Sequence, residues 1–246
     1  MADDRILFMP PVWAPDPEVF ESWPAYDALL ERFRAHWPVD FLRWPTLVGE
    51  PAEGNGWEVM ANAVRKSLTD EHHVIGLWLA TPIVKVLAEL EPRSLVVKDF
   101  GPNPGTLEAA GLPALASLVR AAFAISATPA QSLPSVMHGA DQEFLRRAVE
   151  AVERTLDKGR LLRLLKDPLE EVDAQGSWTL RVPALLLTAR GDFIEAGLAG
   201  ELFRVFAPAA QVESVRHGYR WHERGPGEEF ADKAIPFIEG VIAGES

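Results

Sequence analysis

Six short runs of apolar and β-branched residues recur along the chain, and helical patterns separate most of them. The runs cover residues 5–9, 39–44, 72–77, 94–100, 183–189 and 211–216. The helical patterns cover roughly residues 18–35, 57–69, 79–90, 195–206 and 227–242. Such alternation is typical of a parallel sheet with helices on both faces. The sequence therefore predicts an α/β fold with a mostly parallel sheet of about six strands.

The alternation of strand and helix patterns is interrupted once, between residues 101 and 176, where no convincing strand occurs. Helical patterns lie near 106–125 and 141–158 in this interval, and proline- and serine-rich links separate them. We predict that 101–176 is a helical lid inserted into a core built from residues 1–100 and 177–246.

Charge and composition exclude several classes of function. The net charge of −12 argues against binding to nucleic acid or to an anionic membrane surface. The chain has no cysteine, and none of its six histidines has a metal-ligand spacing, so we expect no metal and no cofactor. No apolar run approaches the roughly 18 residues of a membrane span, and the first residues do not resemble a signal peptide. A cytoplasmic protein is the expectation.

The segment "VIGLWLATP", residues 74–82, reads as a strand, a tight turn and a helix. Residues 76–80 keep the frame small-x-nucleophile-x-small of a nucleophile elbow, with Trp78 at the centre. In this frame the chain resembles the α/β-hydrolase superfamily, and the resemblance extends over nearly its whole length. It implies that Asp192 stands at the acid position and Tyr219 at the position of the catalytic histidine.

The chain departs from that family at the residues that carry out hydrolysis. Trp78 has no nucleophilic atom, and Tyr219, with a pKa near 10, is a poor base at neutral pH. The loop that usually supplies the oxyanion hole contains Pro10 and Pro11, which have no backbone N–H. The resemblance therefore implies an atypical member without a catalytic triad. In this absence the chain is similar to the bottromycin-type peptide epimerases, in which the substrate's own carboxylate is thought to act as the base.

The resemblance also implies a strand order of 2-1-3-4-5-6, without the two antiparallel strands that usually open the fold. The topological switch point then lies between the first and third strands, where ligands of such sheets bind. We expect Asp192 and Tyr219 to be the catalytic candidates. The candidates for ligand binding are Val12, Trp13, Trp78, Leu79, Asp99, His217 and Trp221. An adjacent Lys98-Asp99 pair is more often a plain surface ion pair, and Trp78 is either a plug of an abandoned cavity or a wall of a working one.

Three functions remain open. The first is a non-hydrolytic enzyme, such as an isomerase, lyase or cyclase, acting on a small-molecule or peptide ligand under the lid. The second is a pseudoenzyme that binds a ligand without turnover. The third is a structural partner subunit whose cleft is filled by its own side chains. The abundance of tryptophan, eight residues, favours an apolar or aromatic ligand. A homo-oligomer is left open.

Overall fold

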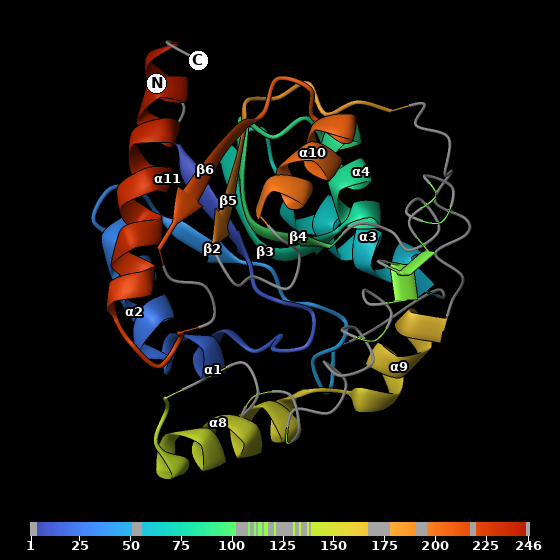
Figure 1. The fold of residues 1–246 in the computed structure, drawn as a ribbon, viewed down its shortest axis with the longest axis vertical. Helices are drawn as coiled ribbons and strands as arrows, with labels where there is room; N and C mark the ends of the chain where they lie inside the picture. Colours follow the sequence, from blue (N-terminus) through green and yellow to red (C-terminus); the bar gives the residue numbers. More distant parts are fainter. Residues whose placement is uncertain are drawn as a thin grey trace.

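The described residues form a six-stranded parallel sheet with the strand order β2-β1-β3-β4-β5-β6 (Figure 1). The computed structural model describes residues 4–50, 56–101, 139–166, 178–189, 196–216 and 220–244, with scattered positions between 108 and 137. The strands are β1 (Arg5–Met9), β2 (Val39–Phe41), β3 (His72–Ala80), β4 (Ser94–Gly101), β5 (Ala184–Ala189) and β6 (Gln211–Val215). The predicted fold class and strand order are confirmed.

Helices cover both faces of the sheet (Figure 1). They are α1 (Pro17–Glu21), α2 (Pro24–Arg34), α3 (Gly56–Ser67), α4 (Thr81–Leu90), α8 (Gln142–Thr155), α9 (Lys158–Lys166), α10 (Ala196–Phe206) and α11 (Gly225–Ala243). On one face α2 packs against α11, and on the other α3 packs against α4 beside α10. The central strands β3, β4 and β5 are almost entirely buried, as expected for a sheet covered on both sides.

The helix expected over 18–35 is two helices, so that prediction was wrong in one detail. Helix α1 ends at Glu21, and the hydroxyl of the following residue, Ser22, donates to the carbonyl oxygen of Val19 at 2.5 Å. Pro24 then begins α2, because proline lacks the N–H that a continuing helix needs but suits a first turn.

Two strands also differ from the prediction by three residues, whereas the other four agree with it to within one residue. β2 ends at Phe41, because the chain turns at Trp44 and Pro45 toward the loop that follows β1. β3 runs on to Ala80, three residues past the expected end, since Ala80 remains in register with Gly101 of β4. The turn around Trp78 is therefore part of the sheet.

The backbone at the start of α11 packs directly against the backbone at the start of α2. A Cβ atom on Gly227 would lie 1.7 Å from the carbonyl oxygen of Ala25, so only glycine fits there. The backbone N–H of Ala25 also donates to the carbonyl oxygen of Trp221 at 3.1 Å. These contacts hold the segment that contains Trp221 against the first turn of α2.

Helices α8 and α9 lie between β4 and β5 in the sequence, within the predicted lid. The side chain of Asp141 caps α8 by accepting from the N–H of Phe144 at 2.7 Å. The end of α8 is attached to the loop after β2, since Val48 N donates to the Thr155 carbonyl oxygen at 2.8 Å and Asp157 N to that of Thr46 at 2.7 Å. The helix expected over 106–125 falls mostly outside the described residues.

No helix among the described residues combines the length and the apolar character needed to cross a membrane.

Candidate functional site

The turn at the carboxyl end of β3 has the backbone geometry of a nucleophile elbow. Trp78 has a φ of 57°, which non-glycine residues rarely adopt. Gly76 permits this turn, because a Cβ atom there would lie 2.3 Å from the Leu79 side chain. The small residue predicted at this position is therefore required by packing, and tryptophan occupies the apex of the elbow.

A second residue with positive φ lies beside the elbow on β4. The register pairs Leu77 with Lys98 and Leu79 with Phe100, so Trp78 and Asp99 occupy facing positions between these pairs. Asp99 has a φ of 63°. Side chains of successive residues in a regular strand point to opposite faces. The unusual backbone of Asp99 breaks this alternation and lets its carboxylate meet the neighbouring Lys98.

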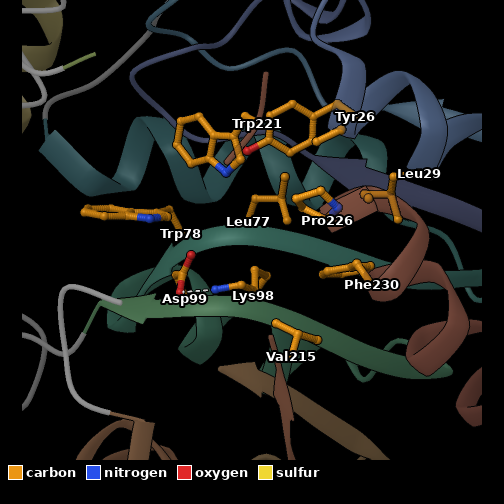
Figure 2. A pocket seen from close by; sticks show the side chains of 12 residues that line it. Tyr26, Leu29, Leu77, Trp78, Lys98, Asp99, Val215, Trp221, Pro226 and Phe230 are labelled. Carbon is orange, nitrogen blue, oxygen red and sulfur yellow. Dashed lines mark hydrogen bonds and ion pairs between the residues drawn. The ribbon is translucent and has the colours of Figure 1, made fainter. Parts of the chain in front are cut away.

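A small cavity of about 30 Å³ lies at this point, beneath α2 and α11 (Figure 2). This volume holds about two water molecules. Its walls are formed by Ala25, Tyr26, Leu29, Leu77, Trp78, Lys98, Asp99, Val215, Trp221, Pro226, Gly227 and Phe230. All of these residues are buried except Trp78 and Asp99, which are partly exposed. These two residues therefore form the mouth of the cavity.

Lys98 and Asp99 form an ion pair on the cavity wall (Figure 2). The distance from Lys98 Nζ to Asp99 Oδ1 is 2.5 Å, and the two side chains are only 11% and 12% exposed. The expectation of a plain surface pair is therefore wrong. The reason is the position of Lys98 in the middle of the sheet, where its register partners are Leu77 on β3 and Leu187 on β5. An ammonium group in such apolar surroundings requires a partner of opposite charge.

An aromatic cluster backs the wall opposite the ion pair. The Trp221 ring stacks against Trp13, with centroids 5.3 Å apart, and against Trp23, with centroids 5.5 Å apart. Tyr26 also contacts Trp221, at 5.6 Å. Trp221 therefore has a fixed position in the wall, whereas Trp13 lies behind it and is not among the lining residues.

The loop after β1, where the family usually places an oxyanion hole, is held by two side chains from the segment after β2. Trp44 Nε1 donates to the carbonyl oxygen of Pro10 at 2.5 Å, and Thr46 Oγ1 donates to that of Val12 at 2.7 Å. The N–H of Ala14 donates back to the Pro11 carbonyl oxygen at 3.0 Å. These bonds fix the loop in its present conformation. Neither Val12 nor Leu79 lines the cavity.

The structure thus brings three predicted residues together at one cavity: Trp78, Asp99 and Trp221. Asp192, His217 and Tyr219 lie outside the described residues, so their roles stay predictions. Sequence reasoning did not select Lys98, Tyr26 or Phe230 as site residues. Of these three residues only Lys98 could have been selected from the sequence, because a charged residue in a strand expected to be buried on both faces requires a partner.

His222, three residues after the position expected for the base, lies toward α8 and does not line the cavity. Its ring centroid is 6.2 Å from that of Phe144 on α8, and its Nε2 lies 3.5 Å from Glu223 Oε1. Among the described residues no group of three histidine, aspartate or glutamate side chains could hold a metal ion.

A serine, a histidine and an aspartate do meet at the opposite edge of the sheet. His73 Nδ1 is 2.8 Å from Ser94 Oγ, and His73 Nε2 is 3.4 Å from Asp4 Oδ1. Ser94 and His73 are both 0% exposed, and burial lowers the pKa of His73. A substrate cannot reach a hydroxyl that is completely buried. This set is a structural network, because it ties the amino ends of β3 and β4 to the segment before β1.

The sheet topology, the elbow and the helices on both faces define an α/β-hydrolase fold. Solved structures agree. A hydrolase from Oleispira antarctica is 14% identical, with a TM-score of 0.66 over 97% of this chain and 92% of that chain. The epoxide hydrolase CorEH is 13% identical, with a TM-score of 0.63 over 97% and 92% of the two chains. A bromoperoxidase from Bacillus anthracis is 11% identical, with a TM-score of 0.61 over 96% and 92%.

At these identities the likeness shows the fold alone. No protein-family model matches the chain, and no curated protein matches it.

Proposed function

We propose that the protein holds a small, largely apolar or aromatic organic molecule in the cleft at Trp78 and acts on it without hydrolysis. The reaction type is that of an isomerase, lyase or cyclase. The strongest support is the identity of the residue at the apex of the elbow. Trp78 lies at the apex where the fold presents a nucleophile, and an indole has no atom that can attack an acyl or epoxide carbon.

The cleft nevertheless contains groups that can move a proton. The Asp99 carboxylate can accept one and the Lys98 ammonium group can donate one, and the two meet at 2.5 Å on the cavity wall. Isomerisation, elimination and cyclisation commonly begin with proton transfer at carbon or oxygen, and they need neither a covalent intermediate nor an oxyanion hole. Asp192 and Tyr219 remain proposed contributors to the same chemistry.

Access to the cleft requires movement of Trp78. The space of about 30 Å³ is too small for an organic ligand. Trp78 and Asp99 are the partly exposed members of the wall, and Trp78 is much the larger of the two. Rotation of the indole therefore opens the cleft most easily, and ligand binding should change the fluorescence of Trp78.

Two measurements test this proposal. Activated esters incubated with the protein should show no hydrolysis above that of a Trp78→Ala control. A screen of small aromatic and apolar compounds by tryptophan fluorescence should find ligands, and mass spectrometry should then detect products of unchanged mass or of elimination. Ester hydrolysis that disappears on replacement of one serine or aspartate near the cleft would contradict the proposal.

The small volume favours a second candidate, a protein whose cleft does not support turnover. Such a protein would be either a ligand-binding pseudoenzyme or a structural subunit with a filled cleft. Ligand binding without any product separates the pseudoenzyme from the enzyme. Absence of all ligands in the fluorescence screen favours the filled cleft.

A further inference from the structure

We infer that the hydroxyl of Thr69 is a second, nucleophilic site, which accepts an acyl group from an activated ester. The site lies where β1 and β3 begin, at the opposite edge of the sheet from the cavity at Trp78. His72 acts as the general base, and Asp40 orients its imidazole. The inference is independent of the proposed function, because the cavity takes no part in it.

The three side chains are joined by successive contacts at hydrogen-bond distance. Thr69 Oγ1 lies 2.8 Å from His72 Nδ1, and His72 Nε2 lies 3.1 Å from Asp40 Oδ2. Thr69 precedes β3, His72 is the first residue of that strand, and Asp40 belongs to β2. A hydroxyl, an imidazole and a carboxylate in this order are the groups that turn an alcohol into a nucleophile.

The backbone determines which ring nitrogen of His72 is free of a proton. The N–H of Thr69 donates to Nδ1 at 3.0 Å, so this nitrogen presents its lone pair. The hydroxyl of Thr69 can therefore donate to the same nitrogen, and the proton of the neutral ring lies on Nε2, where it faces Asp40. The His72 side chain is only 5% exposed, so the ring is held in this orientation. This is the tautomer that a general base requires.

Arg5 keeps the Asp40 carboxylate in the ionised form. Its guanidinium group donates to both oxygens, with Nε 2.8 Å from Oδ2 and Nη2 3.0 Å from Oδ1. The hydrogen bond from Arg5 is the main cause of the lowered pKa of Asp40. A carboxylate that stays ionised stabilises the imidazolium that forms when His72 takes up the proton of the hydroxyl.

Exposure distinguishes this set from the buried serine, histidine and aspartate at the same edge. Ser94 is 0% exposed, whereas Thr69 is exposed. His72 and His73 are successive residues of β3, so their side chains point to opposite faces of the sheet. An acyl donor in solution can therefore reach the hydroxyl of Thr69 and cannot reach that of Ser94.

The reaction is an acyl transfer that needs no oxidant or reductant. Thr69 Oγ1 attacks the acyl carbon while its proton passes to His72 Nδ1. A new C–O bond forms, the bond from the acyl carbon to the leaving oxygen breaks, and the imidazolium returns the proton to the leaving alkoxide or phenolate. The products are an O-acyl threonine and the free alcohol or phenol.

Acetylation by p-nitrophenyl acetate, mapped by peptide mass spectrometry, tests the inference. Thr69 should be acetylated about 100-fold faster than Ser214, an exposed serine on β6, because a general base contributes typically 10²–10⁴-fold. Hydroxylamine should remove the label, since it cleaves esters and leaves the amides formed at lysine. Thr69→Ser should keep rapid labelling at this position, and Thr69→Val should abolish it.

Variants of the two partner residues separate catalysis of the labelling from simple exposure of the hydroxyl. His72→Gln and Asp40→Asn should each slow the labelling of Thr69 by about tenfold or more and leave that of Ser214 unchanged. His73→Gln changes the neighbouring histidine and is the matched control, which should leave the labelling of Thr69 unchanged. Circular dichroism of each variant establishes that it folds.

Two outcomes overturn the inference. Equal rates at Thr69 and Ser214 in the wild-type protein would mean that the three side chains only fix the turn before β3. Rapid labelling of Thr69 that persists in a folded His72→Gln variant would show that the imidazole is not the base. If His72→Gln and Asp40→Asn do not fold, the ratio of the two rates in the wild-type protein decides alone.

Discussion

Trp78 and Asp99 lie at facing positions on the neighbouring strands β3 and β4, and each has a positive φ, 57° and 63°. Outside glycine this conformation costs roughly 1–2 kcal/mol per residue. Both strands therefore depart from regular geometry at the same level, and the departure brings the two side chains to the mouth of one cavity. Strain of this kind persists where surrounding structure enforces it, and it concentrates at functional sites.

Because the backbone at Trp78 has a positive φ, glycine and alanine should have an unusual order of stability at this position. Glycine normally destabilises a strand relative to alanine by roughly 0.5–1 kcal/mol. At a φ of 57° glycine is free of the strain that alanine retains, so Trp78→Gly should be at least as stable as Trp78→Ala. Urea denaturation of both variants measures the difference.

The preceding residue provides the control for this comparison. Leu77 is buried in the regular part of β3, where Leu77→Ala should be more stable than Leu77→Gly. The same order at position 78 would show that the positive φ does not persist in solution. The loss in Trp78→Ala itself should fall below the roughly 3–5 kcal/mol of a buried Trp→Ala change, because Trp78 is partly exposed. A loss of roughly 3–5 kcal/mol would identify Trp78 as a side chain that fills an abandoned cavity.

The Lys98–Asp99 pair should behave as a coupled unit in unfolding. Removing one member takes a contacting opposite charge away from a largely buried group, so Lys98→Met and Asp99→Asn should each lower the free energy of unfolding by about 3 kcal/mol. The double variant removes both charges of the pair and should lose less than the sum of the two single losses. A double-mutant cycle by urea denaturation measures this coupling. Additive losses would mean that the two groups do not interact in solution.

The close approach of α11 to α2 can be tested at two glycines in the same turn. Gly227→Ala places a methyl group against the Ala25 carbonyl oxygen and should cost several kcal/mol, on the order of the largest point-mutant effects. A Cβ atom on Gly225 would meet none of the described residues within 4 Å, so Gly225→Ala should be neutral or slightly stabilising. Thermal unfolding of both variants provides the comparison. Equal effects would contradict the packing of α11 on α2.

Burial of His73 predicts a dependence of stability on pH. Its pKa is lowered by burial, so below the ordinary value of about 6.5 the unfolded chain binds a proton that the folded protein does not. The free energy of unfolding should therefore fall as pH drops below about 6.5, and this loss should level off below the lowered native pKa. Asp40, whose pKa is lowered mainly by its hydrogen bond with Arg5, contributes at more acidic pH, below its ordinary value near 3.8.

A His73→Gln variant should lose the part of this dependence that lies just below pH 6.5, measured by urea denaturation over a pH series. His36, an exposed histidine paired with Glu239, provides the control. The His36→Gln variant should keep the fall in the free energy of unfolding just below pH 6.5. An unchanged slope in His73→Gln would show that another group causes it.

The fold could be predicted from the sequence because its signals are local. The strands are continuous apolar runs, and the glycine and alanine around Trp78 indicate an elbow. The break between α1 and α2 was also encoded locally, by Pro24, although the helical pattern that spans it concealed the break.

The site was predicted less completely because its essential features depend on contacts between distant residues. Asp99 could be placed at the carboxyl end of a strand, but its positive φ and the burial of Lys98 follow from packing against β3, β5 and α11. Likewise, Trp13 was expected in the wall, yet Trp221, some two hundred residues later in the chain, covers it. Nothing in either local sequence indicates which ring faces the cavity.

The last prediction concerns the restoration of a triad. Trp78→Ser with Tyr219→His supplies a hydroxyl and an imidazole to accompany Asp192, yet we expect little esterase activity to return. An oxyanion hole requires donors, each worth about 2.7–4 kcal/mol in the transition state. Pro10 and Pro11 have no N–H, and the loop is fixed by the bonds from Trp44 to Pro10 and from Thr46 to Val12. Release of p-nitrophenol from its acetate measures the activity, with Trp78→Ala/Tyr219→His as the control. Robust turnover that the control lacks would show that the amides of Val12, Trp13 or Leu79 already form an oxyanion hole and that the two prolines do not prevent hydrolysis.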